Sequence, residues 1–387
     1  MSVTAAKGFT AAGVSAGLKS TPGALDVAVV FNSGPRHDAA AVFTTNRCRA
    51  NPVLWSEKVI SNGRVDAVVL NSGGANCYTG DFGYETTALT AEAVANAAQV
   101  EQTDVFVCST GLIGYGDQTF RDKVIGGARR AVEGLSPDGG SAAAEAILTT
   151  DTHAKTAIEH SPAGWTIGAM AKGAGMLAPG LATMLVVITT DAELEFTPLG
   201  VALREATSVT FDRLDSDGCM STNDTVVLLS SGASHVVPDY REFVDRLTEV
   251  CLSLAKQLQS DAEGASHDID IEVVHAVTEQ EAVEVARSVA RNNLFKTAIF
   301  GNDPNWGRVL AAIGTTSAEF DPYDVDVTIN GVRVAHRGQP DAPGDTVDLT
   351  GREVTVQIDL KVGDAQATVM TNDLTHAYVH ENSAYSS

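Results

Sequence analysis

Apolar residues along this chain follow two different spacings. Short runs rich in β-branched residues predict buried or half-buried strands. The strands predicted in this way cover Ala67–Leu70, Val105–Cys108, Met184–Thr190, Thr225–Leu229, Ile269–Val277, Val325–Ile329 and Val354–Leu360. Longer stretches carry apolar residues at three- and four-residue spacing, which predicts helices packed on sheets. These helices cover Glu85–Ala98, Gln118–Val132, Leu199–Thr210, Tyr240–Leu258 and Glu279–Asn292. The two spacings together predict a layered α/β fold.

Turn-forming residues are concentrated in three segments that we predict to be loops: Ser136–Ser141, Gly168–Gly180 and Arg337–Gly344. In the final third of the chain, the alternating strands Val325–Ile329 and Val354–Leu360 are joined by the last of these loops. This part is expected to be more antiparallel than the rest. No repeat or heptad marks a domain boundary.

The charge of the chain excludes whole classes of partner. Its 387 residues include 26 Lys and Arg against 49 Asp and Glu, which gives a formal net charge of −23. Such a charge repels a phosphate backbone or an anionic membrane surface, so we expect no nucleic acid and no membrane partner. The N-terminus lacks the apolar core of a signal peptide, and no run reaches the roughly 18 apolar residues of a membrane span. We therefore expect a cytoplasmic protein.

The cysteines favour neither a disulfide framework nor a metal site. There are five, widely spaced and without a CxxC pair. An odd, scattered set of this kind is typical of reduced thiols in a cytosol. No metal is expected.

The sharpest local feature is a glycine-rich approach to a threonine that opens an apolar strand. Residues 172–190 read KGAGMLAPGLATMLVVITT, with Thr183 at the junction. In structural terms this is a loop that enters a buried strand. In functional terms Thr183 is a nucleophile, freed by cleavage of the bond after Ala182 so that its own α-amine acts as general base. An α-amine titrates at about 7.7–8.0, so this chemistry needs no histidine.

An acyl-threonine also needs hydrogen-bond donors for the developing oxyanion. The segment Cys108–Gly114 predicts a strand followed by a small turn, whose backbone amides can point toward a site. Taken alone, such a turn is common and is usually structural.

Several motifs of this sequence occur together in one known family. They are Thr149–Asp151 (TTD), 172–179 (KGAGMLAP), 182–185 (ATML), Ser221–Thr225 (STNDT), 261–264 (DAEG), Asp303–Arg308 (DPNWGR) and 381–387 (ENSAYSS). In this order they resemble the ornithine acetyltransferases of arginine biosynthesis, the ArgJ family. The resemblance is clear from Thr149 to the last residue. A weaker resemblance begins earlier, at Lys7. The DPNWGR motif is expected to form a turn and a helix start, with Trp306 in the core and no catalytic role.

The resemblance implies the fold and the processing of the chain. The fold would be a layered sandwich of mixed β-sheets flanked by helices, similar to the autocleaving aminopeptidases of the DmpA group. The precursor would cleave itself between Ala182 and Thr183 into an α chain, residues 1–182, and a β chain, residues 183–387. The two chains would remain associated, as a heterotetramer.

The resemblance also assigns roles to single residues. Thr183 would be the nucleophile, and Thr110 and Gly111 would form the oxyanion hole. The substrate-contacting positions would be Thr149, Lys172, Thr183, Glu263, Asn382 and Ser387. We expect Lys172 to meet a substrate carboxylate and Glu263 to meet an amine.

The implied activity is that of a glutamate N-acetyltransferase. The acetyl group of N-acetylornithine passes to threonine, ornithine leaves, and glutamate takes the acetyl group, in a ping-pong exchange without metal or coenzyme. Whether acetyl-CoA also serves as a donor is left open. Departures from the usual family residues at Gly180 and at Ser266–His267 bear on rate and substrate preference.

Two other readings stay open at this point. One is an autocleaving aminopeptidase or amidohydrolase, in which water resolves the acyl-threonine. The carboxylate and amine recognition set, Lys172 and Glu263 with the tail residues Asn382 and Ser387, favours an amino-acid acceptor instead. The other is an uncleaved, non-catalytic homologue that has kept the fold.

Overall fold

The computed structural model describes residues 2–178 and 184–384. The described strands are β1 (Phe9–Val14), β2 (Val27–Asn32), β3 (Asp38–Phe43), β4 (Ala67–Ser72), β5 (Val105–Thr110), β6 (Lys155–His160), β7 (Thr166–Lys172), β8 (Leu185–Thr190), β9 (Thr225–Ser230), β10 (Asp268–Ala276), β11 (Asp326–Ile329), β12 (Val332–His336), β13 (Gln339–Pro340), β14 (Glu353–Asp359) and β15 (Ala365–Asn372). The described helices are α1 (Asn51–Val59), α2 (Gly80–Ala98), α3 (Gln118–Glu133), α4 (Gly140–Ala146), α5 (Phe196–Ser208), α6 (Tyr240–Ser260), α7 (Glu279–Ala290), α8 (Asn293–Phe300), α9 (Trp306–Ile313) and α10 (His376–Ala384).

The strands form three mixed sheets. Sheet A has the order β1-β2-β4-β5, sheet B the order β3-β9-β8-β7-β6, and sheet C the order β13-β12-β11-β14-β10-β15. One pair in each sheet is parallel, namely β4/β5, β8/β9 and β10/β14, and the other pairs are antiparallel.

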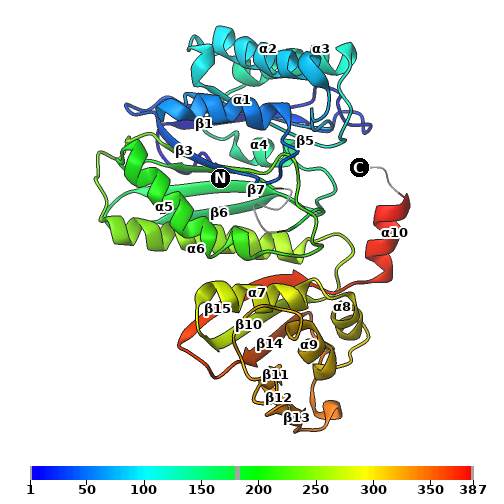
Figure 1. Cartoon of the computed structure of the whole chain (residues 1–387). Coiled ribbons are helices and arrows are strands. Elements are labelled where there is room, and N and C mark those ends of the chain that lie inside the picture. Colours follow the sequence, from blue (N-terminus) through cyan, green and yellow to red (C-terminus); the bar gives the residue numbers. More distant parts are fainter. Residues whose placement is uncertain (1, 179–183, 385–387) are drawn as a thin grey trace.

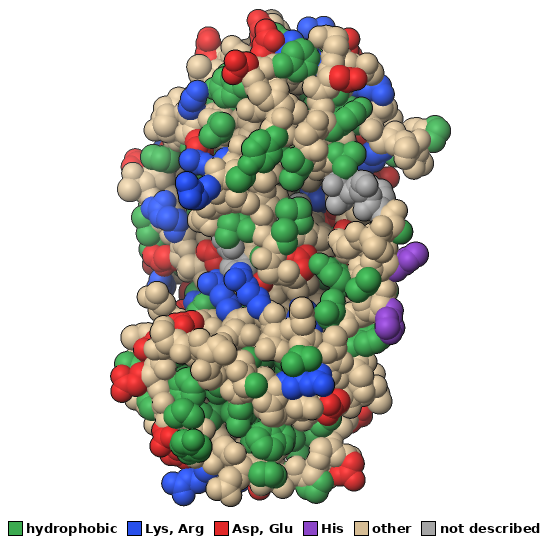
Figure 2. All heavy atoms as spheres, turned by 45° about the vertical axis from the view of Figure 1, so that its right-hand side comes forward, with side chains coloured by type: hydrophobic (Ala, Val, Ile, Leu, Met, Phe, Trp, Pro, Cys, Tyr) green, Lys and Arg blue, Asp and Glu red, His purple; other side chains and the backbone are tan. Residues whose placement is uncertain are grey.

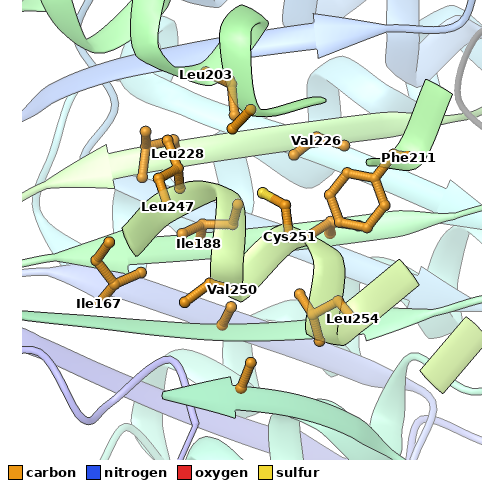
Figure 3. Packing of buried hydrophobic residues seen from close by; sticks show 14 of the residues in the cluster. Ile167, Ile188, Leu203, Phe211, Val226, Leu228, Leu247, Val250, Cys251 and Leu254 are labelled. Atoms are coloured by element: carbon orange, nitrogen blue, oxygen red, sulfur yellow. The ribbon is translucent and has the colours of Figure 1, made fainter. Parts of the chain in front are cut away.

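Sheets A and B face each other and make a four-layered sandwich with helices outside (Figure 1). Their inner faces share a core that includes Phe106 and Val187. Helices α2 and α3 cover the outer face of sheet A, and α5 and α6 cover the outer face of sheet B. Figure 3 shows this last contact, where Leu247 and Cys251 of α6 lie against Ile188 of β8. Because both faces of sheet B are covered, β8 begins with four consecutive apolar residues, and all six of its residues are buried.

Sheet C builds the second body, below the sandwich in Figure 1. Helices α7, α8 and α9 contribute to a single core with one face of the sheet. The strand β14 therefore alternates, with Val354, Val356 and Ile358 buried and the residues between them exposed. As predicted for the final third, β11 and β14 pair antiparallel.

The predicted fold class, a layered sandwich of mixed sheets flanked by helices, is confirmed. Every strand and helix predicted from the apolar spacing is present with small shifts at its ends. Strands rich in alanine and glycine, such as β3 (DAAAVF) and β7 (TIGAMAK), were not predicted because they lack the β-branched runs on which the prediction rests.

The predicted loops are partly wrong. The segment Gly168–Gly180 begins as strand, since β7 continues to Lys172. The segment Arg337–Gly344 contains the short strand β13, and α4 begins within Ser136–Ser141. Trp306 starts α9 as expected, but it is only partly buried and lies at the edge of the core.

Within the described residues, no helix is long and apolar enough to cross a membrane. All five cysteines are free thiols.

Candidate active site

A cavity of about 410 Å³ lies at the ends of β5 and β7. Its wall contains all the described residues predicted to act on substrate: Thr110, Gly111, Thr149, Lys172, Glu263 and Asn382. These residues come from five separate segments of the chain, the last of which is α10. The fold thus brings together positions that are up to 272 residues apart, the difference between 382 and 110.

Lys172, the last residue of β7, is part of this wall and has 1% of its surface exposed. Its Nζ donates to Thr149 Oγ1 at 2.7 Å and to Thr110 Oγ1 at 3.4 Å. Burial lowers the pKa of the Lys172 ammonium, and the nearby carboxylate of Asp151 opposes this shift. A substrate carboxylate would supply a further negative charge to this cation.

Asp151 holds Lys172 through a buried chain of alternating charges. Its carboxylate lies 2.7 Å from Lys155 Nζ and 3.8 Å from Lys172 Nζ, and Lys155 Nζ is 2.5 Å from Asp261. The amide of Gly173 donates to the same carboxylate at 2.6 Å. Burial alone would raise the pKa of Asp151, but the two ammonium groups outweigh it and lower this pKa below its ordinary value. Asp151 is therefore a fixed anion behind Lys172.

Thr110 and Gly111 form a tight turn at the end of β5. The Thr110 carbonyl accepts hydrogen bonds from the amides of Gly73 and Gly74, both at 3.0 Å. Gly111 has a φ of +124°, and a Cβ at this position would lie 2.5 Å from the Gly74 nitrogen. Only glycine fits this close approach, which brings the turn into the cavity wall.

Glu263 and Asn382 line the side of the cavity next to α10. Asn382 Nδ2 donates to Glu263 Oε2 at 3.0 Å, and the Glu263 amide donates to the carbonyl of Ala174 at 3.0 Å. Gly175 leaves room for the carboxylate, because a Cβ there would lie 2.6 Å from Glu263 Oε2. The C-terminal segment up to residue 384 is thus a helix docked at the site.

The strand β8, which follows the predicted nucleophile, lies beside Lys172. Leu185 pairs with Lys172 in the register of β7 and β8. The amide of Met184 donates at 3.1 Å to Asp224 Oδ1, whose side chain is fully buried. Burial raises the pKa of Asp224 well above its ordinary value, and the hydrogen bond from the Met184 amide opposes this shift. Four positions discussed from the sequence lie outside the described residues: Gly180, Ala182, Thr183 and Ser387.

Two acidic residues of the site, Asp151 and Asp224, had no role in the sequence prediction. Both lie inside motifs that carry the family resemblance. A local pattern does not tell a buried carboxylate from an exposed one, because the difference depends on partners such as Lys155 and Met184. The motifs themselves were the only available signal.

Comparison with known proteins identifies the family. The sequence profile of the ArgJ family matches residues 10–387. The chain belongs to the ArgJ family. The arginine biosynthesis bifunctional protein ArgJ of Streptomyces coelicolor is 60% identical to it over 387 residues, which is 100% of both chains. An ArgJ chain from Bacillus halodurans, solved by crystallography, is 35% identical with a TM-score of 0.50 and covers 51% of this chain and 98% of its own length. An ornithine acetyltransferase from Mycobacterium tuberculosis, solved with ornithine, is 49% identical with a TM-score of 0.45 and covers 48% of this chain and 96% of its own.

Membership of the ArgJ family confirms the predicted family and the prediction of an acyltransferase of arginine biosynthesis. The structure places six of the predicted site residues around one cavity. Their individual roles, and cleavage after Ala182, stay predictions.

Proposed function

We propose that this ArgJ protein carries an acetyl group from N-acetylornithine to glutamate through an acetyl ester on Thr183. The observation that carries the proposal is the convergence of Thr110, Lys172 and Glu263 on one cavity. The start of β8, two residues after Thr183, lies beside Lys172 in the same region.

Cleavage before Thr183 would free its α-amine and give an α chain of residues 1–182 and a β chain of residues 183–387. Sheet B contains strands from both sides of this bond, with β3, β6 and β7 before it and β8 and β9 after it. Backbone hydrogen bonds would therefore hold the two products together.

In the first half-reaction the Thr183 amine would take the hydroxyl proton while Oγ1 attacks the acetyl carbonyl of N-acetylornithine. The bond from the carbonyl carbon to nitrogen breaks, and ornithine leaves with the proton. In the second half-reaction the α-amine of glutamate attacks the ester, and Oγ1 leaves and recovers its proton. The Thr110–Gly111 turn would donate hydrogen bonds to the oxyanion formed in each step.

Both substrates share an α-carboxylate, and Lys172 is suited to hold it in each half-reaction. Its buried position makes a charge-assisted hydrogen bond to a substrate stronger than one in bulk water. Glu263 is suited to meet an amine, and Asn382 orients its carboxylate from α10. Thr149 accepts a hydrogen bond from Lys172, and Ser387 completes the predicted contact set.

Three further points belong to the proposal. The relatives are named bifunctional, which suggests a second activity. Acetyl-CoA is the second acetyl donor that we would test first. The α and β chains would assemble into a heterotetramer. The protein would act in the cytoplasm on small-molecule substrates alone.

The proposal can be tested with N-acetylornithine labelled in the acetyl group. With glutamate present, the label should appear mainly in N-acetylglutamate, and without glutamate free acetate should form slowly. Glutamine serves as the matched acceptor that lacks the second carboxylate. Equally fast release of acetate with and without glutamate, and no N-acetylglutamate, would instead identify an amidohydrolase.

A further inference from the structure

The proposed exchange requires one site to hold two amino acids whose side chains end in opposite charges. Ornithine ends in an ammonium group, and glutamate ends in a carboxylate. Lys172 can serve only the α-carboxylate that they share. Glu263 suits the ornithine ammonium but would repel the glutamate carboxylate, so a cation must lie within reach for the second substrate.

A second cavity, of about 320 Å³, adjoins the first at Glu263, which lines both. Its wall also includes Lys296 of α8, Arg291 at the end of α7, Asp217 and Tyr378 of α10. On the face turned forward in Figure 2, the surface is hollowed between the two bodies, with Lys and Arg side chains at its rim. Both signs of charge are thus present next to the predicted transfer site.

Lys296 supplies a buried cation, with 6% of its surface exposed. Its Nζ donates to the Ser216 carbonyl and, at 3.2 Å, to Thr371 Oγ1. These two bonds account for two of the three donors of an ammonium group. Burial lowers the pKa of Lys296 to about 8, against the opposing charges of Asp217 and two further aspartates, Asp215 and Asp373. The ammonium is therefore mostly charged near pH 7.

Arg291 adds a second cation at the same cavity. Its side chain is 48% exposed, and its Nε lies 2.7 Å from Asp215 Oδ2. The guanidinium group has four further N–H donors and cannot be deprotonated near neutral pH. The Arg291 guanidinium can therefore bind a substrate carboxylate together with Lys296 at any working pH.

The anionic side of the cavity is formed by Asp217 and Glu263. Asp217 Oδ1 accepts a hydrogen bond from the Cys219 amide at 3.0 Å. Burial, together with the charges of Asp217 and Glu263, raises the pKa of Tyr378 to about 12. Asp217, Glu263 and Tyr378 all line this cavity.

We propose that the second cavity is the side-chain subsite of the transferase. Lys296 and Arg291 receive the γ-carboxylate of glutamate, and Asp217 and Glu263 receive the δ-ammonium of ornithine. A ligand of either charge finds a partner of opposite sign there, while the α-carboxylate stays on Lys172. The inference rests on the proposed function, because it presupposes that both amino acids occupy one site.

The test separates the two half-reactions by rapid mixing. Lys296→Met should slow the reaction of acetyl-enzyme with subsaturating glutamate by about tenfold or more, the loss expected for a charge-assisted hydrogen bond. Formation of acetyl-enzyme from N-acetylornithine should stay within about twofold. Asp217→Asn should show the reverse pattern. Lys361→Met, which removes a lysine paired with Asp326 in sheet C, is the matched control and should change neither half-reaction.

Two measurements distinguish charge recognition from structural damage. In the wild type, glutamate should be preferred to glutamine as acceptor, and Lys296→Met should abolish this preference while Lys296→Arg retains part of it. Arg291→Gln, at a partly exposed position, should weaken the same preference even if Lys296→Met does not fold. Equal losses in both half-reactions, or an unchanged preference in the folded variants, would overturn the subsite. Absence of acetyl-enzyme in the wild type would instead overturn the proposed function.

Discussion

Lys172 faces Leu185 across the antiparallel pair of β7 and β8. The cation expected to bind the substrate carboxylate is therefore paired with a residue two positions after the predicted nucleophile, Thr183. The same lysine is tied to Thr149 and to Thr110 of the predicted oxyanion turn. This strand pair therefore places the lysine expected to bind the carboxylate beside the strand that follows the predicted nucleophile.

Replacing the nucleophile should remove processing and transfer together. Thr183→Ala should remain a single chain of 40.3 kDa on a denaturing gel and should lose acetyl transfer, because the same hydroxyl attacks the preceding bond and carries the acetyl group. Thr183→Ser should retain part of both functions. A break at the same bond in the alanine variant would show that cleavage does not depend on this hydroxyl.

Loss of the cavity lysine should affect both substrates. Lys172→Met should raise the KM of N-acetylornithine and of glutamate by about 10- to 100-fold, the effect of losing one hydrogen bond to a charged group. Lys123→Met, an exposed lysine that donates to the Gly17 carbonyl, is the control and should leave both values unchanged. A rise for only one substrate would mean that Lys172 does not bind the end that the two share.

The pH dependence should reveal the role of Asp151. Lys172 loses its charge as the pH rises through its lowered pKa, so KM should increase on the alkaline side for both substrates. Asp151 opposes the lowering of this pKa. Asp151→Asn should therefore move the increase in KM to lower pH. Asp138→Asn, at an exposed turn, is the control and should leave the pH profile of KM unchanged. If the wild type and both variants had the same pH profile of KM, a positioning role for Asp151 would be excluded.

The docked C-terminal helix should be needed for activity. Asn382→Ala removes the hydrogen bond to Glu263, and the steady-state rate should fall by about tenfold, consistent with the loss of one hydrogen bond to a carboxylate. Ser383→Ala, the next residue, loses only a bond to the His380 carbonyl and should behave like the wild type. Deletion of residues 382–387 should abolish transfer. Full activity of a stable truncated protein would remove the tail from the site.

The sequence predicts the elements whose signal is local. The run of β8 and the amphipathic face of α6 each identify one element without reference to the rest of the chain. The sequence does not predict the strand β7, because its small residues resemble a loop and become strand only through their pairing with β6 and β8.

In the site, too, the sequence predicts single residues but not the tertiary contacts between them. Motifs in family order predicted Lys172 and Glu263, but the buried chain from Asp151 to Asp261 depends on tertiary contacts that span 106 residues between Lys155 and Asp261. The contact of Asn382 with Glu263 spans 119 residues. No local spacing encodes such pairs, and only the family resemblance placed the tail at the cavity.

The intact mass of the purified protein, before and after N-acetylornithine is added without glutamate, tests the central claim most directly. Before addition, we expect two chains that together account for the 40.3 kDa chain plus one water. After addition, the β chain should gain the mass of one acetyl group and lose it again when glutamate is supplied. A single uncleaved chain, or two chains that never gain an acetyl group, would contradict acetyl transfer through Thr183.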